Sequence, residues 1–273
     1  MLKQRIITAL ILAVVFIGGI YYLDTRWVSL LFSLVLFAAT REYLALTTRA
    51  SMLAKALASA GFALLFWWSL TLMTPSLIYW QSLAGVALWL LVAIGFIFYR
   101  HRDTRPMQQR LALLAVGLVS AWICVHGVIY LHYVYAGGEV LLFMLTLIWL
   151  ADIGAYFSGR SFGKNKLAPS ISPGKTWEGV YGGILVNLVW MLLVFWLSDD
   201  WLEVGLPVFL LIGFATILIS IAGDLFISVL KREAGVKDSG KLLPGHGGIL
   251  DRIDSVIAGT PIFVSGLLVA GSP

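Results

Sequence analysis

Nine long apolar runs, separated by short charged or turn-forming segments, fill most of this 273-residue sequence. Each run approaches the roughly 20 apolar residues that an α-helix needs to cross a lipid bilayer. The runs lie at 6–23, 27–46, 56–74, 77–99, 111–133, 139–159, 179–197, 206–229 and 255–271. This pattern predicts an all-α, polytopic integral membrane protein with about nine transmembrane helices.

The composition supports this fold class. Hydrophobic residues make up 60% of the chain and charged residues only 12%, about half the charged fraction of a soluble domain. We therefore expect a single transmembrane domain over 1–273, with five spans in 1–138 and four spans plus long polar loops in 139–273. The basic residues are not interleaved with aromatic residues on a soluble domain, so nucleic acid is not an expected partner.

The positions of Lys and Arg predict the orientation. If the nine runs alternate in direction, all of the 19 basic residues except Arg26 fall on one side of the membrane. Basic residues concentrate on the cytoplasmic side, so we expect the N-terminus inside and the C-terminus outside. The second run contains Arg41 and Glu42, which we interpret as lying at the interface or pairing with each other.

Two connections on the basic side are too rich in glycine, proline and charge to be simple links. They read "GRSFGKNKLAPSISPGKTWEG" (159–179) and "KDSGKLLPGHGGILDRIDS" (237–255). Each follows a run with an acid near its cytoplasmic end, Asp152 in one and Asp224 in the other. A carboxylate inside an apolar span is unfavourable unless it is paired or metal-bound, so by default it marks function. The alternative is a hydrogen bond that orders the helix bundle.

The spacing of further polar residues extends this hypothesis. Asp224, Ser228 and Lys231 fall on one face of a helix. Asp251 and Asp254 are i, i+3 neighbours at the start of the last run, where the alternative is a helix cap. Aspartates flanked by basic residues suit a divalent cation together with anionic phosphate. The basic candidates are Lys231, Arg232, Lys237 and Arg252.

The two loops also contain candidate phosphate contacts. "SPGKT" is not a P-loop, because Pro169 occupies the position of the first required glycine and no strand is expected before it. Its neighbourhood still provides phosphate-facing candidates, which are Ser172, Lys175, Thr176 and Glu178. Gly247 and Gly248 would let backbone N–H groups approach a phosphate. His246 suits a structural hydrogen bond as well as a catalytic or phosphate contact.

The segment "SVLKREAGVKDSGKLLPGHGGILDRID" (228–254) resembles the signature of the phosphatidate cytidylyltransferases, the CDP-diacylglycerol synthases. The signature reads S-x-x-K-R-x-x-x-x-K-D-x-G-x-x-[LIF]-P-x-H-G-G-x-x-D-R-x-D, and every fixed position is matched. "AD…AYFSGRSFGK…SPGKTWEG" is similar to the same family. The resemblance is strong over about 139–254 and extends to the N-terminal half only in hydropathy.

The resemblance implies that CTP reacts with phosphatidic acid at the inner leaflet of the bacterial cytoplasmic membrane and that Mg²⁺ is required. Expected catalytic residues are Asp224, Lys237, Asp238, His246, Asp251 and Arg252, and expected metal ligands are Asp152, Asp224, Asp251 and Asp254. Substrate contacts are expected from Ser172, Lys175, Thr176, Glu178, Ser228, Lys231, Arg232, Gly247 and Gly248. A homodimer is the alternative to a monomer. Competing functions are a CTP-dependent polyprenol or phytol kinase and a cation transporter.

Overall fold

The computed structural model of the chain describes residues 14, 16–99, 107–135, 138–197, 204–243 and 247–271. Within these residues, eight helices are long and apolar enough to cross a membrane, which confirms the all-α polytopic fold. They are α2 Thr25–Thr47, α3 Met52–Ser69, α4 Pro75–Ile97, α5 Met107–Val134, α6 Glu139–Phe162, α7 Trp177–Leu197, α8 Leu206–Glu233 and α9 Leu250–Val269. A short 3₁₀ turn, Leu70–Leu72, extends α3.

The predicted runs match these helices within a few residues, with two qualifications. Half of the first run, 6–23, lies outside the described residues, and residues 16–22 are helical. The last run was expected from 255, whereas α9 begins at Leu250. The polar residues of "LDRID" hide the first turn of this helix from hydropathy, and the structure therefore places Asp251 and Asp254 within α9.

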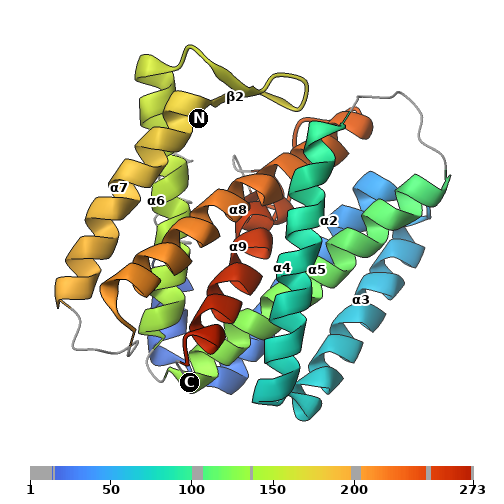
Figure 1. Cartoon of the computed structure of the whole chain (residues 1–273). Helices are drawn as coiled ribbons and strands as arrows, with labels where there is room; N and C mark the ends of the chain where they lie inside the picture. Colours follow the sequence, from blue (N-terminus) through green and yellow to red (C-terminus); the bar gives the residue numbers. More distant parts are fainter. Residues whose placement is uncertain are drawn as a thin grey trace.

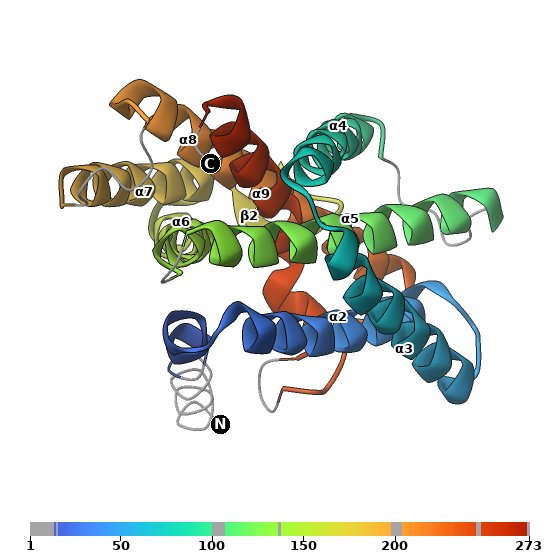
Figure 2. The same ribbon diagram turned by 90° about the horizontal axis from the view of Figure 1, so that it is seen from below.

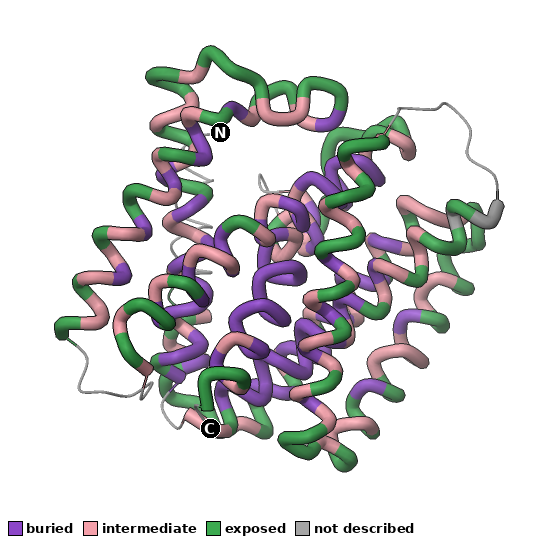
Figure 3. The backbone as a smooth tube through the Cα atoms, viewed as in Figure 1, coloured by how far each residue is buried: buried purple, intermediate pink, exposed green. Residues whose placement is uncertain are grey.

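Helix α9 forms the centre of the bundle, as Figures 2 and 3 show. It packs against α8 and also contacts α2, α4, α5 and α6. Helices α3, α4 and α7 lie at the periphery and expose large apolar side chains, among them Trp68, Leu91 and Trp196. Lipid can cover such a surface, so the burial pattern agrees with membrane-spanning helices.

Glycines bring α6 and α7 into close backbone contact. A Cβ atom on Gly154 of α6 would stand only 3.0 Å from both the Gly182 carbonyl oxygen and the Gly183 Cα of α7. Small residues at such positions allow close packing of transmembrane helices, which depends on van der Waals contact rather than on the hydrophobic effect. The pair forms a support for the polar segment that joins the two helices.

That joining segment is a small antiparallel hairpin at one end of the bundle (Figure 1). Strand β1 spans Lys166–Ala168, and β2, which is the segment "SPGKT", spans Ser172–Thr176. The expectation that no strand precedes "SPGKT" is therefore wrong, since β1 comes before it and pairs with it. The P-loop remains excluded, because β2 leads directly into α7 without an intervening glycine-rich loop.

Candidate active site

The two polar connections meet at the hairpin end of the bundle. The C-terminal ends of α6 and α8 and the N-terminal ends of α7 and α9 lie there. Three acids from three helices approach one another beneath the hairpin. Asp152 on α6 interacts electrostatically with Asp224 on α8, and Asp254 on α9 interacts with both. Like charges in a poorly hydrated site repel one another, so nearby cations or bound protons stabilise this cluster.

A lysine from the hairpin provides one such cation. The Lys175 Nζ atom lies 2.5 Å from Asp224 Oδ2, and both side chains are about one quarter exposed. The Ser228 hydroxyl donates to the other oxygen of Asp224 at 3.3 Å. Strand β2 and helix α8 are therefore joined by an ion pair at the acidic cluster. The expected shared face of Asp224 and Ser228 on α8 is confirmed.

Lys231, the third residue expected on that face, pairs with a different acid. Its Nζ atom lies 2.7 Å from Asp251 Oδ1. The second oxygen, Asp251 Oδ2, accepts hydrogen bonds from the Ser239 N–H at 2.8 Å, the Ser239 hydroxyl at 3.0 Å and the Gly248 N–H at 3.0 Å. Both oxygens of Asp251 thus organise the loop between α8 and α9.

The arrangement of these acids bears on metal binding. Among the residues that the structure describes, no three His, Cys, Asp or Glu side chains converge closely enough to hold one ion. Asp224 and Asp254 lie where the backbones of α8 and α9 touch, since a Cβ atom on Gly223 would collide with the Asp254 carbonyl oxygen. Mg²⁺ usually takes one or two carboxylates and completes its shell with substrate phosphates and water. The pair Asp224 and Asp254 fits such a site. The Asp224 side chain is 26% exposed, whereas the Asp251 side chain is only 7% exposed and accepts four hydrogen bonds from the loop and from Lys231.

Two phosphate candidates from the first loop have structural partners. Thr176 is buried, and its Oγ1 atom accepts a hydrogen bond from the Gly179 N–H at 3.2 Å, which caps the start of α7. The Glu178 carboxylate accepts from the Asn165 side chain at 2.7 Å and from the Asn165 backbone N–H at 3.2 Å. These contacts hold the hairpin on α6 and α7, so we assign both side chains a structural role.

The remaining candidates lie around the cluster. Lys237 and Asp238 are exposed on the loop, and Arg252 interacts electrostatically with Asp152. The Arg232 Nε–H donates to the Ile171 carbonyl at 3.5 Å, a long contact to the tip of the hairpin. His246 lies outside the described residues.

Gly247 and Gly248 were expected to approach a phosphate. Gly247 has a φ of 84°, which favours glycine because L side chains are strained in this region. The Gly248 N–H already donates to Asp251. The structure thus gives both glycines a role in shaping the loop, and their predicted contact with phosphate stays a prediction.

A cleft of about 480 Å³ opens beneath the hairpin between α6, α7 and α8. Its polar part includes Asp152, Arg160, Ser172, Lys175 and Asp224, and its apolar wall includes Val180, Ile217 and Ile221. This volume lies within the range of about 300–1,000 Å³ that is typical of ligand sites. The cleft can therefore accept a charged group beside the acids and an apolar chain along the helices.

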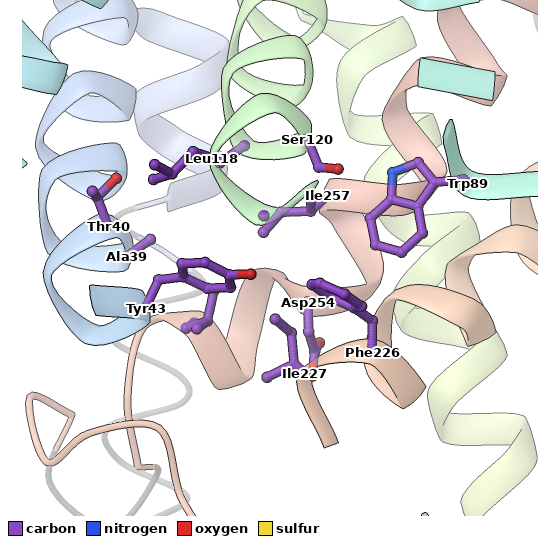
Figure 4. Close-up of a pocket in the computed structure, with 13 residues that line it drawn as sticks. Ala39, Thr40, Tyr43, Trp89, Leu118, Ser120, Phe226, Ile227, Asp254 and Ile257 are labelled. Atoms are coloured by element: carbon purple, nitrogen blue, oxygen red, sulfur yellow. The ribbon is translucent and has the colours of Figure 1, made fainter. Parts of the chain in front are cut away.

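A second, much smaller cavity lies beside Asp254, among α2, α4, α5, α8 and α9 (Figure 4). Its volume of about 10 Å³ corresponds to about one water molecule. Thr40 Oγ1, Trp89 Nε1 and Ser120 Oγ line this cavity, and each is buried with no protein hydrogen-bond partner. Asp254 thus shares this cavity with three buried polar groups, and its own Oδ1 atom accepts a hydrogen bond from the Ser255 N–H at 2.8 Å.

The structure adds a residue that the sequence had not assigned to the site. Of the two alternatives for Arg41 and Glu42, a position at the interface or a pair with each other, the structure does not show the pair. The carboxylate of Glu42 on α2 instead accepts hydrogen bonds from Ser239, Ile249 and Leu250. The available sequence signal was an acid inside an apolar run, which is a sign of function in membrane helices. Its partners are about 200 residues away in the chain.

Comparison with known proteins places this geometry in a family. The sequence profile of the cytidylyltransferase family matches residues 3–269. The chain belongs to the cytidylyltransferase family. The match covers both halves of the molecule. It includes α2 and α5, which the sequence motifs alone did not assign to the family.

Individual relatives carry a more specific name. The phosphatidate cytidylyltransferase of Pseudomonas aeruginosa is 37% identical over 99% of this chain and 98% of its own length. The phosphatidate cytidylyltransferase of Haemophilus influenzae is 52% identical over 49% of this chain and 47% of its own length. The phosphatidate cytidylyltransferase of Staphylococcus epidermidis is 37% identical over 63% of this chain and 66% of its own length. The family membership is consistent with the signature in 228–254.

Proposed function

We propose that this cytidylyltransferase acts on phosphatidic acid and CTP to form CDP-diacylglycerol and pyrophosphate. A phosphate oxygen of the lipid attacks the α-phosphorus of CTP, and the bond between the α-phosphorus and the bridging oxygen to the β-phosphate breaks. The pyrophosphate leaves with that oxygen. A phosphomonoester has its second pKa near 6, so the nucleophile is already largely ionised at neutral pH. The enzyme must therefore supply position and charge neutralisation.

The observation that carries this proposal is the mixed character of the large cleft. Acids and Lys175 line its polar part, and Val180, Ile217 and Ile221 form an apolar wall at helix depth. A lipid phosphate and its acyl chains require both surfaces within one site. A cation pathway would require only the polar one, so the cleft favours a lipid enzyme over the transporter considered above.

The residues divide into four pairs by their contacts. Lys175 and Arg252, next to the acids, are suited to bind and orient the phosphates of CTP and the lipid. Asp224 and Asp254 are the residues that would hold Mg²⁺, which, when bound, supplies positive charge to the phosphates in the transition state. Lys231 and Asp251 hold the loop that carries Lys237 and Asp238. We propose that these last two side chains, which are exposed, contact the nucleotide.

The position of the site supports a location at the inner leaflet of the bacterial cytoplasmic membrane. The connections at the hairpin end carry the excess of basic residues, which points to the cytoplasm. CTP is a cytoplasmic solute, and phosphatidic acid can reach the cleft from the adjacent leaflet. The homodimer stays a prediction.

A labelling experiment with purified protein tests the proposed reaction. The protein is incubated with phosphatidic acid, Mg²⁺ and CTP labelled with ³²P at either the α- or the γ-position. We expect lipid labelling from α-labelled CTP only, with release of pyrophosphate. Lipid labelling from γ-labelled CTP would instead indicate a CTP-dependent lipid kinase and would overturn the proposal. A polyprenol offered as the alternative acceptor should remain unlabelled.

A further inference from the structure

Glu42 connects the N-terminal half of the molecule to the polar loop between α8 and α9. Its Oε2 atom accepts hydrogen bonds from the Ser239 hydroxyl at 2.9 Å and the Leu250 N–H at 2.9 Å. Its Oε1 atom accepts from the Ile249 N–H at 3.1 Å. Both carboxylate oxygens are thus used by residues 197 to 208 positions away in the chain.

Two of these contacts cap the start of α9. The first N–H groups of a helix have no partner within the helix and require one from elsewhere. Ile249 stands at the N-cap of α9 and makes no side-chain capping bond of its own. The negative charge of Glu42 also lies at the positive end of the helix dipole. A residue of α2 therefore performs the function that a local Ser, Thr, Asp or Asn usually performs.

The third contact reaches the acids of the site. The Ser239 hydroxyl lies 2.9 Å from Glu42 Oε2 and 3.0 Å from Asp251 Oδ2. The hydroxyl has a single proton, so it donates to either Glu42 or Asp251 at any one time. The Ser239 backbone N–H donates to Asp251 in both cases. Glu42, Ser239, Asp251 and Lys231 thus form a continuous chain of contacts from α2 to α8.

Two glycines of the signature pack directly against this carboxylate. A Cβ atom on Gly240 would collide with the end of the Glu42 side chain and with no other residue among its three nearest atoms. A Cβ atom on Gly248 would collide with both Glu42 and the Ser239 hydroxyl. The space that these glycines leave is filled by Glu42, which explains why side chains are absent at both positions.

We propose that Glu42 is a positioning residue that holds the 237–250 loop and the first turn of α9 in their active arrangement. It acts through Ser239, Ile249 and Leu250, which fix Asp251 and the first turn of α9, the helix that carries Asp254. The expected fall in kcat rests on the proposed cytidylyl transfer. The expected loosening of the 237–250 loop does not depend on it. The role of Glu42 also assigns a function to the N-terminal helices.

The first test compares Glu42→Gln with wild type in purified protein. The amide removes the charge and one acceptor oxygen, so kcat should fall about 10- to 100-fold, as expected for charged hydrogen bonds. The KM for CTP should change less than about threefold, because no substrate contact is removed. Arg41→Gln, at the exposed neighbouring position, serves as the matched control and should retain wild-type kinetics.

Hydrogen exchange of the same proteins provides a readout that does not require activity. The backbone amides of 239, 249 and 250 should exchange at least about tenfold faster in Glu42→Gln than in wild type. Unchanged exchange in this loop would overturn the positioning role, whatever the enzyme catalyses. Faster exchange in a protein without cytidylyl transfer would refute the proposed function alone.

A double-variant cycle distinguishes positioning from general destabilisation. Gly240→Ala should displace the Glu42 carboxylate and lower kcat by a factor similar to that of Glu42→Ala. In the Glu42→Ala background, Gly240→Ala should add less than about twofold, because the colliding side chain is gone. Multiplicative effects of the two substitutions would show that residues 42 and 240 act independently, and would overturn the proposal.

Discussion

At the scale of single residues, similar aspartates have different partners. Asp224 pairs with Lys175 of the hairpin. Asp251 uses both oxygens for Lys231, Ser239 and Gly248. The sequence shows the acids as one group with similar spacing to basic residues. Only the structure shows that Asp224 lines the open cleft, whereas Asp251 is nearly buried and organises a loop.

This distinction predicts different effects of Asp→Asn substitutions. Asp224→Asn and Asp254→Asn should each abolish Mg²⁺-dependent turnover, because the amide keeps the shape but removes the charge. The double variant should be little worse than either single variant, since residues that serve one ion act as a unit. Asp251→Asn should instead lower the rate, because it loosens the loop between α8 and α9. The Mg²⁺ concentration that gives the half-maximal rate should stay unchanged.

Activity measured against Mg²⁺ concentration checks these expectations. Asp24→Asn, an exposed acid before α2, is the control and should behave as wild type. Full Mg²⁺-dependent activity in either Asp224→Asn or Asp254→Asn would show that the pair does not hold the metal.

At the scale of elements, the β-hairpin controls one wall of the cleft. Ile171 at its tip is buried against Leu225 and Val229 of α8. This apolar contact lies on the same helix as Asp224, to which Lys175 of β2 is paired. The hairpin is thus attached to α8 by this apolar contact, by the Lys175–Asp224 pair and by the long contact from Arg232 to the Ile171 carbonyl, and these contacts hold Lys175 over the acids.

Ile171→Ser should detach the tip of the hairpin. Burial of an Ile side chain contributes about 1.5–3 kcal/mol, so the closed hairpin should become less populated by about tenfold or more. We expect the KM for CTP to rise by a similar factor, with normal membrane insertion. Ser170→Ala, at an exposed position of the same turn, is the control. Wild-type kinetics in Ile171→Ser would show that the tip contact does not influence substrate binding.

At the scale of the whole molecule, the connections at the hairpin end carry almost all of the positive charge. The connections at the opposite end carry only Arg26 among the basic residues. This asymmetry predicts that the hairpin end faces the cytoplasm. It also places the site on the side where CTP is available.

Labelling of introduced cysteines tests this orientation. Ser76→Cys and Leu242→Cys are exposed positions at opposite ends of the helices, and Cys124→Ser removes the single native thiol, which is buried. In intact spheroplasts, a membrane-impermeant maleimide should label position 76 and should label position 242 only after permeabilisation. The reverse pattern would contradict the orientation and the cytoplasmic site. Ser239 is unsuitable for this purpose because it is buried and bonded to Glu42.

The sequence by itself determined the features that depend on local composition. Apolar runs of bilayer length predicted seven of the helices closely, and α9 except for its first turn. Charge asymmetry predicted an orientation, and the acids inside spans pointed to Asp152 and Asp224. These signals are readable because burial in lipid constrains each segment independently of its neighbours. The signature in 228–254 likewise identified the loop that joins α8 and α9.

The tertiary structure decided how these parts are connected. The hairpin was missed because its two strands are short and polar, without the alternation that marks a strand. The partners of Glu42 and Asp251 could not be predicted, because a hydrogen bond between residues 197 apart leaves no periodicity or spacing in the sequence. Such contacts form only once helix packing has brought α2, α8 and α9 together. The sequence therefore identified the charged groups of the site, and only the packing of the helices determined which of them face the cleft and which hold it in shape.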